Sequence, residues 1–172
     1  MSRALFILVL VLGTGLVGCG DDSPAGLEVS CEMADQLGEE LAPGLVFDGG
    51  GSRFRSGEPI TFSFSVMNCT DSQMVISYPN AQRYEFTVEA SSDQPLEVWR
   101  WSSGRRFAEG LADETFEPGE TKTYTETWDQ RADAGQLVPP GTYLLTSDDL
   151  HCEVPDAPSD CASGVAVVFE LK

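Results

Sequence analysis

The residues Ile60-Thr61-Phe62-Ser63-Phe64-Ser65-Val66 alternate strictly between large apolar and small hydroxylated side chains. A period of two places the apolar set on one face of a β-strand and the hydroxylated set on the other. Such a strand is buried on one side and exposed on the other, which is typical of antiparallel sheets. Residues 60–66 are therefore the clearest strand of the chain, and the rest of the fold is predicted around them.

Seven further segments have the alternation or composition of strands. They are 27–33, 74–78, 84–88, 96–101, 121–128, 142–146 and 164–171. Turn signals such as Glu117-Pro118-Gly119-Glu120 recur at intervals of about 8 to 12 residues, as they do in sandwich domains. Residues 33–41 could form one or two helical turns, although Gly38 weakens that helix. The sequence predicts an all-β fold, an antiparallel β-sandwich of about eight strands.

The composition restricts the function. A length of 172 residues fits one ordinary domain with a short extra segment. Ten Lys and Arg stand against 28 Asp and Glu, for a formal charge of −18, so the chain repels phosphate backbones and nucleic acid is not an expected partner. The single His leaves little room for His-based catalysis. We expect no catalytic residues and no cofactor.

The first residues have the pattern of an export signal. Arg3 precedes an apolar run from Ala4 to Val17, which is shorter than a membrane-spanning helix. The run ends in Leu16-Val17-Gly18-Cys19, which resembles the lipobox of bacterial lipoproteins. The resemblance implies cleavage before Cys19 and a lipid on its sulfur; an ordinary signal peptide that contains a cysteine is the alternative.

These features divide the chain into three parts. Residues 1–18 are the expected signal peptide, 19–26 a lipid-anchored flexible tether, and 27–172 the folded domain. The lipid would anchor the protein in a membrane of the bacterial cell envelope. The outer membrane is favoured, with the domain facing the periplasm or the cell surface.

Four cysteines remain after Cys19, namely Cys31, Cys69, Cys152 and Cys161. Export places them where disulfides persist, and four cysteines allow three pairings. Cys152 and Cys161 bracket a short acidic loop, which favours their pairing and leaves Cys31 with Cys69. One disulfide, or a zinc site, is the alternative. No CxxC spacing supports zinc, and we expect no metal.

The span from 58 to 143 resembles the BsuPI-type domain, named for an intracellular proteinase inhibitor of bacilli. The resemblance lies in the order and spacing of several short elements. They are Asn68-Cys69-Thr70, Tyr84-Glu85-Phe86, Val98-Trp99-Arg100-Trp101-Ser102 with Phe107, Phe116-Glu117-Pro118-Gly119-Glu120, Trp128, and Pro140-Gly141-Thr142-Tyr143. The family usually has Asp where this chain has Glu85. The resemblance implies an immunoglobulin-like sandwich and, from the family name, inhibition of a proteinase.

Two functions follow from these observations. The first is a non-enzymatic envelope lipoprotein whose sandwich binds another protein or supports an assembly. The second is a proteinase inhibitor that acts outside the cytoplasm, which requires an exposed and ordered loop. The loop between Cys152 and Cys161 has this character because its two prolines favour extended neighbours. The expected contact residues are Val154, Pro155, Asp156, Ala157, Pro158 and Ser159.

The aromatic, acidic and basic groups of the chain have alternative interpretations. The tryptophans Trp99, Trp101 and Trp128 are core residues or, alternatively, a sugar-binding platform. The carboxylates Asp148, Asp149, Glu153, Asp156 and Asp160 form a solvated loop or, less readily, a calcium site, because the spacing of a calcium loop is absent. The arginines Arg100, Arg105 and Arg106 form a basic cluster, with Arg105-Arg106 at a hairpin tip, where they contact an acidic partner or balance the local field. His151 beside Cys152 does not support a catalytic pair, because adjacent side chains usually point apart.

Overall fold

The alternating residues 60–66 lie in β4 (Ile60–Asn68), a central strand of a four-stranded sheet. The computed structural model describes residues 26–92, 94–149 and 163–172. The order of this sheet is β1-β2-β4-β9, and every pairing in it is antiparallel. Its other strands are β1 (Gly26–Leu27), β2 (Leu41–Phe47) and β9 (Thr121–Trp128).

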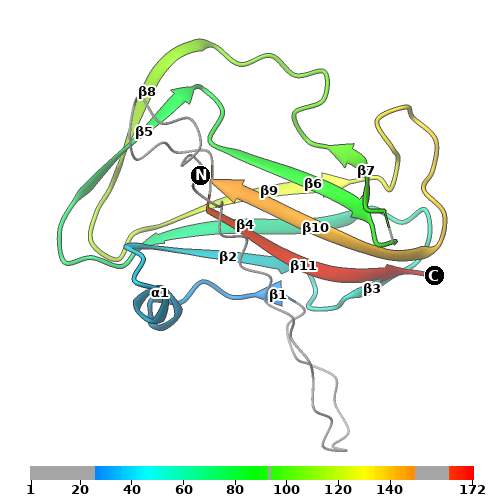
Figure 1. The fold of residues 1–172 in the computed structure, drawn as a ribbon, viewed down its shortest axis with the longest axis horizontal. Helices are drawn as coiled ribbons and strands as arrows, with labels where there is room; N and C mark the ends of the chain where they lie inside the picture. The colour runs from blue at the N-terminus through cyan, green and yellow to red at the C-terminus, as the bar shows by residue number, and fades with distance from the viewer. Residues whose placement is uncertain (1–25, 93, 150–162) are drawn as a thin grey trace, which may run out of the picture.

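A five-stranded sheet forms the second layer (Figure 1). Its order is β3-β11-β10-β6-β7, with β3 parallel to β11 and the other pairs antiparallel. Its strands are β3 (Arg53–Phe54), β6 (Tyr84–Ala90), β7 (Leu96–Arg100), β10 (Gly141–Asp149) and β11 (Ser163–Leu171). The remaining strands, β5 (Met74–Asn80) and β8 (Glu109–Phe116), pair with each other as an antiparallel ribbon.

Aromatic side chains from both sheets fill the core. Phe62 on β4 packs edge-on against Phe86 on β6, with ring centroids 4.9 Å apart. Phe47 on β2 meets Phe169 on β11 in the same way at 5.4 Å. Offset and edge-on arrangements of this kind favour aromatic pairs beyond their buried area. The predicted all-β sandwich is confirmed.

The strand count and the first element differ from the prediction. The described residues contain eleven strands rather than about eight. Residues 27–33 are not one strand, because Cys31–Leu37 forms helix α1. Gly38 ends that helix in the left-handed conformation, with φ of 75°, so the glycine that seemed to argue against a helix is its C-terminal cap.

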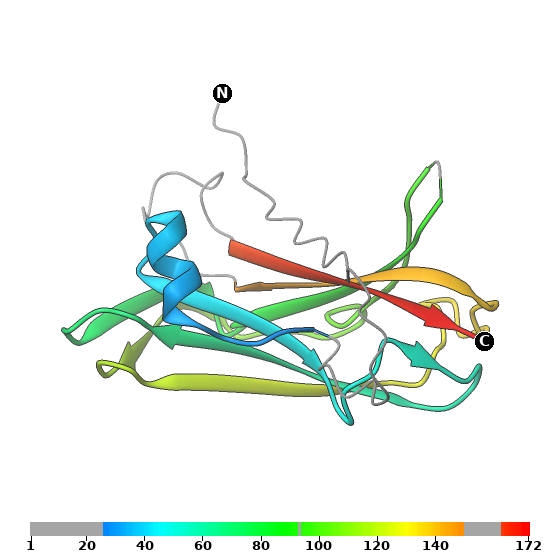
Figure 2. The same cartoon turned by 90° about the horizontal axis from the view of Figure 1, so that it is seen from below.

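Helix α1 covers part of the outer face of the four-stranded sheet (Figure 2), and β1 forms an edge of that sheet. Ala34 of α1 and Ala42 of β2 are both buried there. A disulfide joins Cys31, the first residue of α1, to Cys69 just beyond β4. Gly44 lies under the chain before α1, where an added Cβ would be 2.5 Å from the nitrogen of Val29. We call residues 26–40 the strap.

Beyond the strap, the outer face of the same sheet is hydroxylated. Three cross-strand pairs join the side-chain hydroxyls of β4 and β9 at 2.8 to 2.9 Å. The pairs are Thr61–Thr127, Ser63–Thr125 and Ser65–Thr123. The small polar set of the opening alternation is thus the outer face, as its period predicts. Within the described part of the chain, no helix has the length and apolarity to cross a membrane.

Candidate functional site

An exposed stretch that is attached to the sandwich core connects β7 to β8. We call residues 101–108 the β7–β8 segment; it runs along the upper side of the molecule in Figure 1. Residues 103–106 and 108 are exposed, whereas Trp101 is buried and Phe107 is half-buried. The segment therefore has two inward anchors and an exposed stretch between them.

The start of the segment is held by the carboxylate of Glu85 on β6. This side chain is only 8% exposed. One carboxylate oxygen accepts the backbone N–H groups of Phe86 and Ser102, both at 3.1 Å. The other accepts the hydroxyl of Ser102 and lies 3.6 Å from Nη1 of Arg100. A buried carboxylate is tolerated because it has these donors, and they fix the turn that begins the segment.

A stack of side chains supports the same turn from inside. Tyr84 lies between Tyr124 and Trp101, with ring centroids 4.5 Å away on each side. The guanidinium of Arg105 covers the Trp101 ring at 4.2 Å, and its Nε donates to the Trp101 carbonyl at 2.9 Å. Burial, followed by the hydrogen bond that Tyr84 donates to Glu126, raises the pKa of the Tyr84 hydroxyl. Arg105 is thus fixed by stacking and by a directional hydrogen bond.

The end of the segment is held by Phe107 and Ala108. The Phe107 ring packs against Trp101 at 5.6 Å between centroids. The carbonyl of Ala108 accepts the N–H of Ala81 at 3.0 Å, just before β8 pairs with β5. Gly104, with φ of 74°, provides a left-handed turn that a side chain would strain. Both ends are therefore attached to the sandwich.

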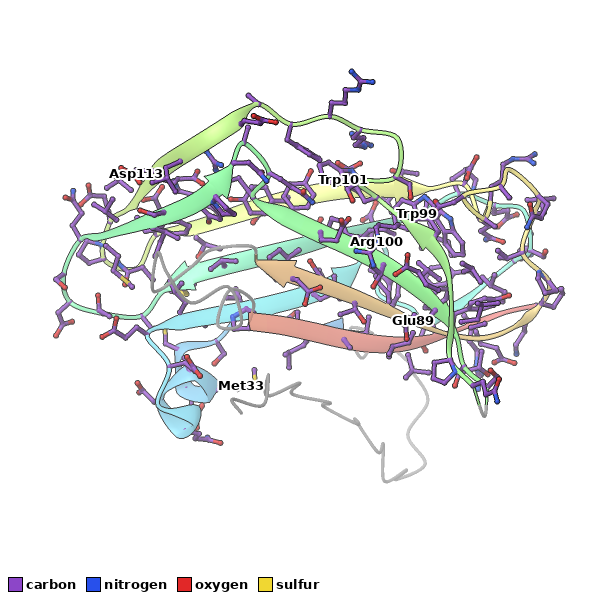
Figure 3. The ribbon with its side chains drawn as sticks, turned by 45° about the horizontal axis from the view of Figure 1, so that its top comes forward. Met33, Glu89, Trp99, Arg100, Trp101 and Asp113 are labelled. Carbon is purple, nitrogen blue, oxygen red and sulfur yellow. A yellow bond between two sulfur atoms is a disulfide. The ribbon has the colours of Figure 1, made fainter. Side chains whose placement is uncertain are left out.

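A groove of about 460 Å³ lies on the outer face of the five-stranded sheet. Glu89 and Arg100 come from its neighbouring strands β6 and β7 (Figure 3). Arg100 forms a hydrogen-bonded ion pair with Glu97, and these bonds raise the pKa of its guanidinium. Burial raises the pKa of Asp148 on β10, and the charge of Glu85 adds to the shift. The lining of this groove thus has three acidic side chains, Glu89, Glu97 and Asp148, and one basic side chain, Arg100.

The described residues include no group of three or more His, Cys, Asp or Glu side chains that could hold a metal ion. Of the acidic cluster, Asp148 has a described side chain; for Asp149 the structure describes the backbone. The other members of that cluster lie in residues 150–162, outside the described residues.

The tryptophans belong to the interior. Trp101 and Trp128 are 8% and 1% exposed. Trp99 is half-buried and packs against Phe62 and Trp128. The core interpretation is correct for these side chains, and the alternative of a sugar-binding platform is wrong because two of the three rings are covered.

Several predicted site residues lie outside the described residues. They are Cys19, Cys152, Cys161 and the whole contact loop from Val154 to Ser159. Their predicted roles therefore stay predictions. The structure does contain the Cys31–Cys69 disulfide.

The sequence analysis missed the role of Glu85. Its position in Tyr84-Glu85-Phe86 was a signal, because a carboxylate between two aromatics of a buried strand needs donors. The structure brings this motif against Arg100-Trp101-Ser102 and Phe107, so two separate elements of the resemblance meet at the β7–β8 segment. Of the predicted basic cluster, Arg105 and Arg106 lie on that segment and Arg100 lies in the adjacent groove.

Comparison with solved structures finds partial likenesses only. Spo0M, a sporulation control protein from Bacillus subtilis, is 10% identical over 77% of this chain and 49% of its own, with a TM-score of 0.45. The β-glucosidase EmGH1 from Erythrobacter marinus is 15% identical over 77% of this chain and 15% of its own, with a TM-score of 0.43. The chain thus spans less than half the length of these proteins. The search of curated proteins finds no match.

The pattern of one protein family matches residues 49–148, which are 100 of the 172 residues. The family is BsuPI, described as intracellular proteinase inhibitor. The match contains the span 58–143 that carries the resemblance, together with the whole β7–β8 segment and Glu85. The chain therefore belongs to the BsuPI family.

Proposed function

We propose that this protein is a non-enzymatic binding module of the cell envelope that inhibits a proteinase. One observation carries the proposal: in a member of the BsuPI family, the structure holds an exposed segment, residues 101–108, at both of its ends. The envelope location rests on the lipobox around Cys19.

The physical argument concerns the entropy cost of binding. A flexible loop loses conformational freedom when it enters a proteinase cleft, and each immobilised side chain adds about 0.5–1.5 kcal/mol. In the β7–β8 segment much of this cost is already met by the fold, because Glu85, Trp101 and Ala81 hold it in place. A pre-ordered exposed segment on a rigid sandwich is what an inhibitor needs, and equally what any protein-binding module needs.

The test is inhibition of purified proteinases. The mature chain without its lipid, made by replacing Cys19 with serine, is titrated against trypsin-like, chymotrypsin-like and subtilisin-like enzymes. Sub-micromolar inhibition of at least one enzyme is the expected result. A second variant, with residues 154–159 replaced by a Gly/Ser sequence, tests the loop predicted from sequence. No inhibition at tens of micromolar would leave a binding module whose partner is another envelope protein.

The lipid anchor has its own test. Replacing Cys19 with alanine removes the sulfur that the lipid would occupy, so we expect an unprocessed precursor that incorporates no fatty-acid analogue. Ser23→Ala is the matched control and should incorporate the label as the unaltered chain does. Label retained on the Cys19→Ala chain would contradict the lipoprotein interpretation.

A further inference from the structure

Arg106 differs from every other cationic side chain that the structure describes. The chain has ten Lys and Arg, and all but Arg3 lie in described residues. Eight of these nine form ion pairs, namely Arg53, Arg55, Arg83, Arg100, Arg105, Lys122, Arg131 and Lys172. Arg106 forms none within the described part of this acidic chain, and it is exposed.

The residues on either side of Arg106 are fixed. The residue before it, Arg105, lies on the Trp101 ring, and the residue after it, Phe107, packs against the same ring. Two neighbours held by one tryptophan leave the backbone of Arg106 little freedom. Its guanidinium is thus presented to solvent from an ordered position, which lowers the entropy cost of capturing it.

The backbone beside Arg106 is available for pairing. Residues 105–108 belong to no strand. In the described structure the nearest backbone hydrogen bonds are those of the Arg105 N–H to Ser102 and of the Ala108 carbonyl to Ala81. The peptide groups of Arg106 and Phe107 lie between these two bonds. Backbone N–H and C=O groups without partners in the described structure can pair with the edge of another chain, as substrates do in proteinase clefts.

From these observations we propose that Arg106 is the specificity residue of this inhibitor, and that its partner is a serine proteinase that cleaves after basic residues. This inference rests on the proposed function. A pocket that accepts Arg presents a carboxylate, with which the planar guanidinium forms two parallel hydrogen bonds. Arg106 forms no ion pair with the acidic residues that the structure describes, so its donors are available to such a carboxylate.

The chemistry separates this proposal from the nearest alternative. Leu111 on β8 is 77% exposed and would suit a chymotrypsin-like or subtilisin-like enzyme. Its own position in β8 is irregular, because the register with β5 shifts between Tyr78–Ala112 and Asn80–Glu109. The two residues therefore differ in side-chain chemistry, and the enzyme that is inhibited distinguishes them.

The experiment compares five chains that carry serine at position 19, the unaltered domain and four variants. The unaltered domain should inhibit a trypsin-like enzyme more strongly than a subtilisin-like one. Arg106→Ala should weaken inhibition of the trypsin-like enzyme by about 30-fold or more, the loss typical of a central interface residue. Arg106→Lys should retain most of it, and Arg106→Leu should shift the preference toward a chymotrypsin-like enzyme. Arg53→Ala, an exposed arginine on β3, is the control and should change nothing.

The outcomes distinguish this inference from the function on which it rests. Failure of the unaltered domain to inhibit any enzyme would overturn the proposed function itself. Inhibition that survives in Arg106→Ala would overturn the role of Arg106 and leave the function standing. Rapid cleavage between Arg106 and Phe107 without inhibition, seen by mass spectrometry, would also overturn it. Equal melting temperatures of the five chains show that a folding defect does not cause the differences in inhibition.

Discussion

Glu85 shows how one buried carboxylate can organise an exposed segment. Its two oxygens accept donors from Phe86, Ser102 and Gln82 and pair with Arg100. Gln82 and Phe86 lie just before and on β6, whereas Ser102 lies in the turn after β7. The carboxylate therefore joins β6 to the start of the β7–β8 segment. This role explains why an acidic residue occupies the middle of an aromatic motif.

Replacing Glu85 with alanine should destabilise the protein and loosen the segment. The N–H groups of Phe86 and Ser102 would lose their acceptor, and an unsatisfied buried donor costs about 1–3 kcal/mol. Chemical denaturation should show this loss, and hydrogen exchange of the Ser102 amide should accelerate. Glu97→Ala, which removes a more exposed partner of Arg100, is the control. Unchanged exchange at Ser102 in the Glu85→Ala chain would contradict the proposed attachment.

Asp148 predicts a pH dependence of stability. Burial raises its pKa above the ordinary value of 3.8, the charge of Glu85 raises it further, and Arg100 opposes the shift. The native state therefore holds this proton more tightly than the unfolded chain does. The free energy of unfolding then falls as the pH rises from about 3.8 through the raised pKa.

Asp148→Asn removes this contribution. We expect a higher melting temperature than that of the unaltered chain at neutral pH and a smaller difference between the two chains near pH 3, measured by calorimetry. Asp113→Asn on the exposed β8 is the control. If the melting temperatures of the two asparagine variants change with pH in the same way, the burial of Asp148 has no effect on stability.

Among the elements, the strap depends on one covalent bond. The Cys31–Cys69 disulfide joins two residues that are 38 positions apart in the sequence. In the chain-entropy description, a loop of this size gives about 3–4 kcal/mol. The double variant Cys31→Ser/Cys69→Ser should lose most of that amount in urea denaturation. Ser30→Ala is the control, because the Ser30 side chain makes no capping hydrogen bond; equal stability of both variants would show that the bond contributes nothing.

The elements also show what the sequence could and could not predict. Strand β4 was predictable because one of its faces is apolar and the other hydroxylated, and β9 because it is rich in Thr and carries Tyr and Trp. Strand β2 was not, since Pro43 and Gly44 interrupt it, and Gly44 is required only because Val29 passes over it. Strand β8 is mostly polar, and it is a strand because β5 pairs with it. Tertiary contacts, which have no local signal, decide both cases.

The candidate site also combines features that have a local sequence signal with features that depend on tertiary contacts. The pair Arg105-Arg106 was predicted at a hairpin tip, and this is wrong: β7 pairs with β6 and β8 with β5, so both arginines lie in an exposed connection between two sheets. Which arginine is fixed and which is free could not be predicted, because it depends on Trp101 and on Tyr84, which lies in a different part of the chain.

At the scale of the whole molecule, Trp128 of the four-stranded sheet packs against aromatic residues of the five-stranded sheet. It is 1% exposed, and its ring lies 6.0 Å from Trp99, 6.4 Å from Tyr143 and 6.2 Å from Phe169. Trp128→Ala and Tyr143→Ala should each cost about 3–5 kcal/mol in denaturation, through lost apolar contact and a cavity. Tyr143→Phe is the matched variant. It loses only the bond to the Pro139 carbonyl at 2.6 Å, worth about 1 kcal/mol.

The matched region and the folded unit do not coincide. Residues 49–148 exclude β1, α1, β2 and β11. Strand β2 lies between β1 and β4, and β11 lies between β3 and β10, so each is an interior strand of its sheet. The family pattern therefore describes the middle of a domain whose two sheets are completed by strands from either end of the chain.

The chain enters the domain on the side opposite the β7–β8 segment. In Figure 1, β1 and α1 lie along the lower side of the molecule, and the segment before β8 lies along the upper side. Six residues lie between Cys19 and Gly26, so the two residues are at most about 25 Å apart when the chain is fully extended. A lipid on Cys19 would thus anchor the side of the domain that carries the strap close to the bilayer, and Arg106 would face away from the membrane. A proteinase free in the surrounding fluid could reach that arginine, whereas one embedded in the same membrane would have to rise above the whole sandwich.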